Sequence, residues 1–258
     1  MSSNLWSYLR RRPILALSAI ALAPLASHII PSYRGYLELG PGGLPYNFLG
    51  YSIQAALQPF SFGDTTDPVP FSNPKVFAAH GSHGRGRFLG EGPLPRRRGD
   101  RPVVPSYVAP QRQTTDKGDE TVMSHLNAYL SELANQKPTL LIIKASVLES
   151  KDYRALHLND NLPNYLAKTT KGEIVHVHQE ASSHMVLSLA DAEEATRTGW
   201  AERHKLSGKL GRLPLSYVLI YAPRDDDEFE VWKRLVHAAI GFTTAPETAT
   251  DAEKQTEV

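Results

Sequence analysis

The sequence predicts an α+β fold: a small, mainly antiparallel sheet with helices packed on one face, preceded by an N-terminal membrane helix. Short apolar runs bounded by turn residues recur in the second half of the chain and are typical of strands. Two segments, 122–133 and 225–240, repeat apolar residues at helical spacing and predict amphipathic helices. The stretch 13–30 carries no formal charge apart from a possible one on His28, which is barely enough for one membrane span.

The composition excludes several classes of function. Of the 258 residues, 41% are hydrophobic and 21% charged, which indicates one ordinary globular domain with attachments. The 28 basic and 27 acidic residues leave a net charge of +1, so no global field attracts nucleic acid and we expect no nucleic-acid partner. The absence of cysteine excludes disulfides, thiolate nucleophiles and zinc ribbons. Any metal would need histidine and carboxylate ligands.

Shifts in composition divide the chain into five parts. They are a membrane anchor at 1–31, a juxtamembrane turn and helix at 32–62, a loop region rich in Pro, Gly and Arg at 63–117, an α+β domain at 118–244 and a disordered tail at 245–258. Three arginines at 10–12 precede the apolar stretch, and the positive-inside rule places the N-terminus in the cytosol. We expect a single-pass membrane protein located in the endoplasmic reticulum. A cleaved signal peptide is the alternative, because small residues lie near Ala26.

The elements of the body follow in order. Residues 47–57 come after a Gly-rich turn and predict a short apolar helix, whereas 63–117 shows no periodicity and predicts loop, in part disordered. After the helix at 122–133 we expect strands at 139–148, 173–178, 184–189 and 217–221, and a helix at 191–204. The second and third strands are close enough to form a hairpin. Acidic residues in the first turns of the last two helices favour them through the helix dipole.

Histidines alternate along the strand at 173–178. His176, His178 and Glu180 would share one face if the strand continued that far, because successive side chains alternate between faces. Two imidazoles and a carboxylate match the ligands of iron oxygenases, so a metal-dependent oxygenase is one hypothesis. The alternative is a polar sheet face without a ligand.

A site without a cofactor is the second hypothesis. Histidine transfers protons near neutral pH, and arginine stabilises developing oxyanions. His204 follows Arg203 near the end of a predicted helix, and Arg224 comes just after the strand that ends in Tyr221. With the other histidines, these groups could surround an acidic organic substrate. A structural ion-pair network is the alternative for the arginines.

Several short motifs together resemble the fungal luciferase family. They are Tyr-Leu-Glu-Leu-Gly-Pro with Asn-Phe-Leu-Gly-Tyr at 36–51, Gly-Asp-Arg-Pro at 99–102, Gln-Arg-Gln at 111–113, Glu-Ile-Val-His-Val-His at 173–178, Gly-Trp-Ala-Glu-Arg-His-Lys-Leu at 199–206 and Tyr-Ala-Pro-Arg at 221–224. They occur in consistent order along the chain, which makes the resemblance more specific than any single motif.

The resemblance implies a membrane-attached oxygenase that acts on a small enolisable phenolic or pyrone compound, 3-hydroxyhispidin in the luminescent members. Dioxygen is the co-substrate, and no metal or flavin cofactor is implied. The chemistry needs a base for an enolic proton and cations for the enolate and peroxide charge. The candidates are His176, His178 and His204 for the base, Arg203 and Arg224 for the cations, and His184, Tyr221, Glu202 and Trp200 for substrate contacts. A non-catalytic membrane protein that binds a small molecule is a further alternative.

Overall fold

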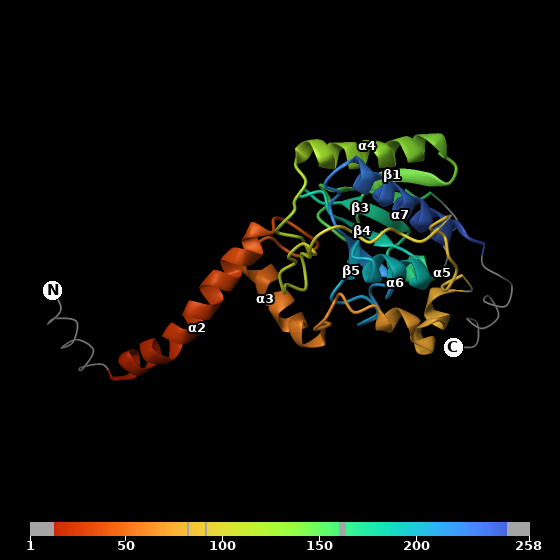
Figure 1. Cartoon of the computed structure of the whole chain (residues 1–258). Coiled ribbons are helices and arrows are strands. Elements are labelled where there is room, and N and C mark those ends of the chain that lie inside the picture. The colour runs from red at the N-terminus through yellow and green to blue at the C-terminus, as the bar shows by residue number, and fades with distance from the viewer. Residues whose placement is uncertain (1–12, 82, 91, 160–163, 247–258) are drawn as a thin grey trace.

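A computed structural model describes residues 13–81, 83–90, 92–159 and 164–246 (Figure 1). A long N-terminal helix leads into a body built on one sheet. The first twelve residues of the predicted anchor and the predicted tail from residue 247 onward lie outside the described residues.

The described residues form one antiparallel sheet of six strands in the order β1-β2-β3-β4-β6-β5. The strands are β1 (Leu141–Ala145), β2 (Arg154–Leu158), β3 (Glu173–Val177), β4 (Ser183–Val186), β5 (Ala201–Arg203) and β6 (Tyr217–Ile220). The predicted α+β class with an antiparallel sheet is confirmed, and so is the predicted hairpin, which is formed by β3 and β4.

The register of this hairpin positions the histidines. His176 of β3 pairs with His184 of β4, which in turn pairs with Leu219 of β6. Because side chains alternate along a strand, these residues share one face of the sheet while Val175 and Val177 point to the other. A shift of one residue would send one of the two imidazoles to the opposite face.

Helices α4 (Glu120–Gln136) and α7 (Asp226–Thr244) cover the face opposite to the histidines (Figure 1). Trp232 of α7 is almost fully buried, and its indole N–H donates to Ser183 Oγ at 2.9 Å. Ser183 pairs with Val177 and so belongs to the face that carries the valines. The apolar layer of the body therefore lies between these two helices and the sheet, as the helical spacing of their apolar residues predicts.

The histidine face is covered by irregular chain instead. The remaining helices are α2 (Pro13–Glu38), α3 (Phe48–Leu57), α5 (Asn164–Lys168) and α6 (Leu189–Arg197), with 3-10 turns η1 (Gln58–Phe60), η2 (Val69–Ser72), η3 (Pro74–Val76) and η4 (Ala78–His80). The described part of the predicted loop region contains η2, η3 and η4 but no α-helix or strand, and its segment 111–113 is almost fully buried. Gln113 accepts a hydrogen bond from the Ala222 amide, and Gln111 contacts His184. This segment therefore lies over the histidine face.

The predicted helix at 191–204 is wrong at both ends. Helix α6 starts earlier, after its N-cap Ser188, and ends at Arg197. Gly199 then adopts a φ of +92°, a left-handed conformation that favours glycine and stops a helix. Residues 201–203 form strand β5 instead, so Arg203 and His204 lie on and just after a strand rather than near a helix end. Strand β2 and the short helix α5 were not predicted.

The predicted membrane helix is not supported. Helix α2 covers the predicted apolar stretch, but among the described residues no helix is long and apolar enough to cross a membrane.

Removing the N-cap of α6 should destabilise the body modestly. Ser188 is fully buried, and its hydroxyl oxygen accepts the Asp191 amide at 3.0 Å. We expect Ser188→Ala to lower the free energy of unfolding by about 1 kcal/mol, because one amide loses its partner. Urea unfolding followed by circular dichroism measures this. Ser52→Ala, which removes an exposed hydroxyl, is the control, and an equal loss in both variants would contradict the capping role.

Candidate active site

Four histidines converge on one face of the sheet, and we call them the histidine cluster: His176, His178, His184 and His204. His176 and His184 come from β3 and β4, His178 follows β3, and His204 follows β5. All four are at least 93% buried. Ring centroids lie 5.0 Å apart for His176 and His178, 4.7 Å for His178 and His184, and 5.4 Å for His184 and His204. The imidazoles predicted to lie close together are neighbours in the structure, and their role as site residues stays a prediction.

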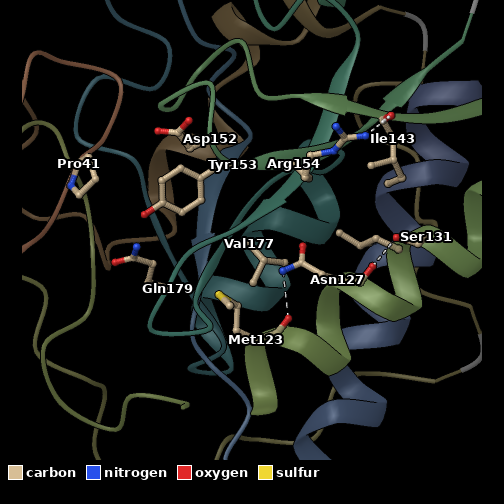
Figure 2. A pocket seen from close by; sticks show the side chains of 11 residues that line it. Pro41, Met123, Asn127, Ser131, Ile143, Asp152, Tyr153, Arg154, Val177 and Gln179 are labelled. Atoms are coloured by element: carbon tan, nitrogen blue, oxygen red, sulfur yellow. Dashed lines mark hydrogen bonds between the residues drawn. The ribbon is translucent and has the colours of Figure 1, made fainter. Parts of the chain in front are cut away.

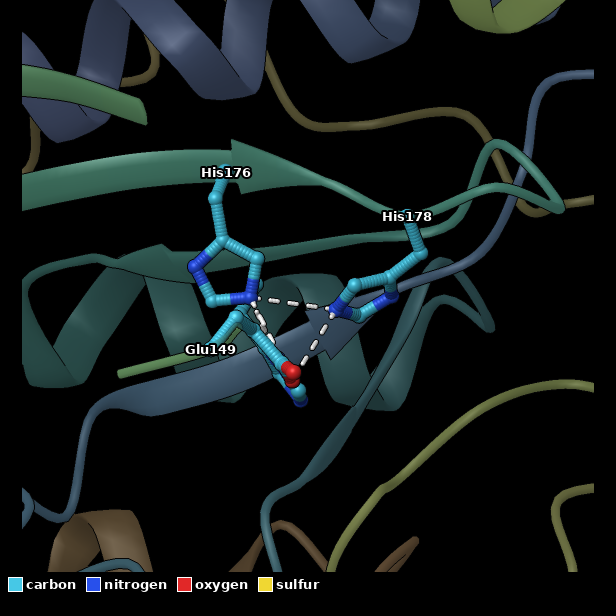
Figure 3. A group of neighbouring side chains, drawn as sticks. Glu149, His176 and His178 are labelled. Atoms are coloured by element: carbon cyan, nitrogen blue, oxygen red, sulfur yellow. Dashed lines mark hydrogen bonds and ion pairs between the residues drawn. The ribbon is translucent and has the colours of Figure 1, made fainter. Parts of the chain in front are cut away.

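Three of these rings turn a nitrogen toward a common point. His176 Nε2 lies 3.1 Å from His178 Nε2 and 3.2 Å from His184 Nδ1. The carboxylate of Glu149, in the loop after β1, lies opposite, with Oε1 3.8 Å from His176 Nε2 and 3.7 Å from His178 Nε2 (Figure 3). These four ligand atoms all lie within 4.8 Å of one another, close enough to hold one metal ion. We call these four residues the ligand quartet.

Glu149 replaces the carboxylate that the sequence predicted for this position. Glu180 comes after β3 has ended, and it contacts His178 through Ser182, whose hydroxyl donates to Glu180 Oε1 at 2.5 Å. Its carboxylate therefore lies behind His178 rather than among the converging nitrogens.

Arg112 is the guanidinium that borders the cluster. It lies almost fully buried and donates from both terminal nitrogens to Glu149, at 3.0 and 3.1 Å, and its Nε lies 3.7 Å from Glu180. Burial lowers the pKa of Arg112, but the adjacent Glu149 carboxylate raises it by a larger amount, so the guanidinium stays charged. Arg112 belongs to the Gln-Arg-Gln motif at 111–113, but the motif alone does not predict a site role for it. No local pattern in the sequence marked Glu149 as a site residue.

Burial lowers the pKa of three rings of the cluster, His178, His184 and His204, and keeps them uncharged. Burial lowers the pKa of His178 and His184 well below the usual 6.5, and the charge of Arg112 lowers both further. Burial likewise lowers the pKa of His204 to about 3. His204 Nδ1 accepts the Leu206 amide at 3.1 Å, so its Nε2 carries the proton. The predicted role of His204 as a base stays a prediction.

Arg203 lies apart from the cluster. As the last residue of β5 it points to the other side of the strand from His204. Its Nη2 donates to the Asp64 carbonyl at 2.6 Å, and the guanidinium lies 4.0 Å from the centroid of the Phe62 ring. The contacts of Arg203 hold the loop at 62–64 against the sheet.

Arg224 is also placed elsewhere. Its guanidinium donates to Glu228 and to the Arg98 carbonyl, and Glu228 also accepts from the buried Arg97 at 3.1 Å. These contacts match the ion-pair alternative raised for Arg224. They tie the start of α7 to the loop region.

Neutralising Glu228 should destabilise this ion-pair network. Burial tends to raise the pKa of Glu228, but hydrogen bonds from Arg224 and the charge of Arg97 hold it below its usual 4.5. The stabilisation is therefore present above the unfolded-state pKa and lost as pH falls through the folded-state value. We expect Glu228→Gln to lower the free energy of unfolding by about 2 kcal/mol at pH 7 and by less at pH 3. Urea unfolding at both values measures this, and an equal loss at both would contradict the charge-based explanation.

The predicted substrate-contact residues divide into two groups. Glu202 accepts from Tyr221 at 3.0 Å and from Gln111 at 2.9 Å, and Gln111 contacts His184, so Glu202 and Tyr221 are linked to the cluster through one amide. Trp200 instead donates to the Pro95 carbonyl at 2.7 Å and packs in the core.

Two cavities lie near these groups. The larger, of about 550 Å³, runs between α4 and the sheet on the face of Val177 and ends near Tyr153 and Gln179 (Figure 2). The smaller, of about 270 Å³, is lined by Arg112, Lys117, Gln179 and Glu180 among others. No histidine of the cluster lines either cavity; Arg112 and Glu180 lie between the smaller cavity and the histidines, because both contact groups around the cluster.

Residues 171–239 match the family model described as Luciferase domain. This segment of the chain resembles a luciferase domain. It is 28% identical over 225 residues to a protein named Luciferase from Neonothopanus nambi, with 82% of this chain and 80% of that protein covered. Proteins of the same name from Armillaria ostoyae and Armillaria gallica are each 27% identical, with 88% and 89% of this chain and 85% and 88% of those proteins covered. No solved structure matches the chain significantly.

The resemblance to the luciferases of luminescent fungi, predicted from short motifs, is thus confirmed over most of the chain. The matched segment begins just before β3 and ends within α7, so it contains the whole histidine cluster. Glu149 and Arg112 lie outside the matched segment and reach the cluster from the first half of the body.

Proposed function

We propose that this luciferase-domain protein is an oxygenase that combines O2 with a small, enolisable phenolic or pyrone compound at the histidine cluster. The observation that carries the proposal is the convergence of buried imidazoles inside the segment that matches the Luciferase family model. The relatives named Luciferase support an oxidoreductase that acts with O2. The proposal covers both the class of substrate and the emission of light.

The chemistry of the site suits such a substrate. An uncharged imidazole has a lone pair that can accept an enolic proton during the reaction. Arg112 and Lys117 line the cavity beside the cluster and would attract an enolate. Arg112, rather than Arg203 or Arg224, is the cation placed to stabilise negative charge near the histidines.

Membrane attachment is proposed on the sequence alone. The uncharged stretch 13–30 after three arginines supports a single-pass anchor, with the endoplasmic reticulum as the location. Cell fractionation of the full chain and of a chain lacking residues 13–30 tests it. Recovery of both in the soluble fraction would rule the anchor out.

Oxygen consumption tests the proposed reaction. The purified full chain is incubated in air with 3-hydroxyhispidin and close analogues, and dissolved O2 and photons are recorded together. We expect uptake of O2 that saturates with substrate. Uptake without photons would identify an oxygenase that emits no light, and uptake at the rate of the protein-free control would favour the alternative of a non-catalytic small-molecule-binding protein.

A further inference from the structure

The ligand quartet brings three imidazole nitrogens and a carboxylate oxygen together in a space shielded from water. His176 and His178 are 1% and 0% exposed, and the side chain of Glu149 is 6% exposed. The converging nitrogens are separated by 3.1 and 3.2 Å, which is hydrogen-bond distance. Such a distance is stable only if a proton or another cation lies between the lone pairs.

The outer nitrogen of His176 already carries the proton of that ring. His176 Nδ1 lies 2.5 Å from Glu173 Oε1. Glu173 also accepts from Ser146 Oγ and from the Val147 amide, so it is an acceptor on all sides. Three donors around one side chain, from His176, Ser146 and Val147, are what a carboxylate accepts. The nitrogen facing the quartet, Nε2, therefore holds a lone pair in the neutral ring.

In His178 and His184, too, the proton is on the ring nitrogen that faces away from the centre of the quartet. Ser182 gives its hydroxyl proton to Glu180, so His178 Nδ1, 2.8 Å away, donates to Ser182 Oγ. The amide nitrogen of Gln111 donates to Glu202 and to a backbone carbonyl, so its oxygen faces His184 Nε2 at 3.1 Å and accepts from it. His178 Nε2 and His184 Nδ1 thus also present lone pairs to the centre.

We propose that Glu149, His176, His178 and His184 bind one divalent first-row transition-metal ion. A single proton on one ring satisfies at most part of the set, whereas an ion about 2.1 Å from each nitrogen places tetrahedral ligands about 3.4 Å apart, close to the observed spacings. Imidazole and carboxylate ligands suit iron, zinc, nickel and copper. Hydrogen bonds from each outer ring nitrogen to a carboxylate, a hydroxyl and an amide are typical of metal-bound histidines.

The charge of the site favours a dication. Three buried acidic side chains, Glu149, Glu173 and Glu180, surround the quartet with one buried guanidinium, that of Arg112. An ion with two positive charges offsets this excess of acidic groups. Because low-dielectric surroundings penalise uncompensated charge, the ion stabilises the packed site.

This inference concerns the site of the proposed oxygenase and departs from the predicted reaction without a cofactor, which itself stays a prediction. The ion would lie where the enolate and peroxide charges form, next to Arg112. Metal binding and oxygen uptake are separate measurements, so each proposal can fail alone.

The test measures metal binding by the full chain. Protein is purified without chelator for elemental analysis, then stripped with EDTA and titrated with Co2+, whose visible absorption reports its ligands. We expect about one ion per chain. His178→Ala and Glu149→Gln should weaken Co2+ binding at least 100-fold, whereas His204→Gln, which alters a histidine of the same cluster outside the quartet, should leave it within about threefold. Circular dichroism confirms that each variant is folded.

The outcomes separate the two proposals. Absence of saturable Co2+ binding, or equal binding by His178→Ala and His204→Gln, would overturn the metal site. Oxygen uptake by a protein that shows no saturable Co2+ binding would leave the proposed oxygenase in place without the metal. Metal binding without oxygen uptake would confirm the metal site and remove the proposed function.

The contact of Glu173 with His176 gives a finer prediction. Glu173→Gln keeps the size of the side chain but weakens the acceptor for His176 Nδ1. Loss of such a partner typically lowers metal affinity 10- to 100-fold. We expect this loss in the Co2+ titration, with the absorption spectrum of the bound ion preserved, because the quartet itself is intact. An unchanged affinity would show that Glu173 acts only in folding.

Discussion

Replacing His178 by alanine should reduce oxygen uptake with a pyrone substrate by roughly 100-fold to 10 000-fold. His178 is fully buried at the centre of the cluster, and its Nε2 faces both His176 and Glu149. The substitution removes either a proton acceptor or a metal ligand, and both hypotheses for the site require that nitrogen. The measurement is the initial rate of O2 consumption at saturating substrate.

Substitutions of two other histidines serve as comparisons for His178→Ala. His204→Ala removes a ring that contacts His184 but lies outside the quartet, so its effect should be clearly smaller than that of His178→Ala. His237→Gln alters a histidine on α7 that contacts Tyr129, on the opposite side of the sheet, and should leave the rate within about twofold. A fall in rate for His237→Gln as large as that for His178→Ala would indicate general loss of folded protein. A rate for His178→Ala equal to wild type would place the reaction elsewhere.

The elements of the body were predictable where local pattern decides structure. The amphipathic spacing of α4 and α7 and the paired apolar runs of β3 and β4 depend on neighbouring residues, and these elements lie where they were expected. Helix α6 was extended too far because a single glycine, Gly199, ends it through a left-handed conformation that periodicity does not reveal. Strand β2 has the sequence Arg-Ala-Leu-His-Leu, which contains no continuous apolar run to predict a strand.

The site was predictable only in part, for a similar reason. His176, His178 and His184 lie on adjacent strands of one hairpin, so alternation of side chains was sufficient to place them together. Glu149 and Arg112 reach the cluster from loops distant in sequence, and only tertiary packing brings them there. Arg203 and Arg224 show the converse: chemically suitable residues close in sequence to the site make their contacts elsewhere.

Replacing Arg112 by methionine should be among the most destabilising single substitutions in the body. Arg112 is 2% exposed and makes two hydrogen bonds to Glu149, whose side chain is also buried. Removing one partner of a buried ion pair leaves the other charge uncompensated, at a cost of about 3–5 kcal/mol. Urea unfolding of the EDTA-treated protein measures this loss. Arg85→Met, which breaks an exposed pair with Glu193, is the matched control and should cost less than about 1 kcal/mol.

The same substitution connects stability to the proposed metal. In Arg112→Met a divalent ion bound by the quartet still neutralises Glu149, so the loss of stability should shrink when the protein is saturated with Co2+. In the double variant Arg112→Met with Glu149→Gln no buried carboxylate is stranded at that position, and the protein should be more stable than Arg112→Met alone. If the double variant is instead less stable, Glu149 is held by contacts other than Arg112. If Co2+ stabilises neither wild type nor Arg112→Met, the charge at the centre of the quartet is balanced by protons on the imidazoles rather than by a metal.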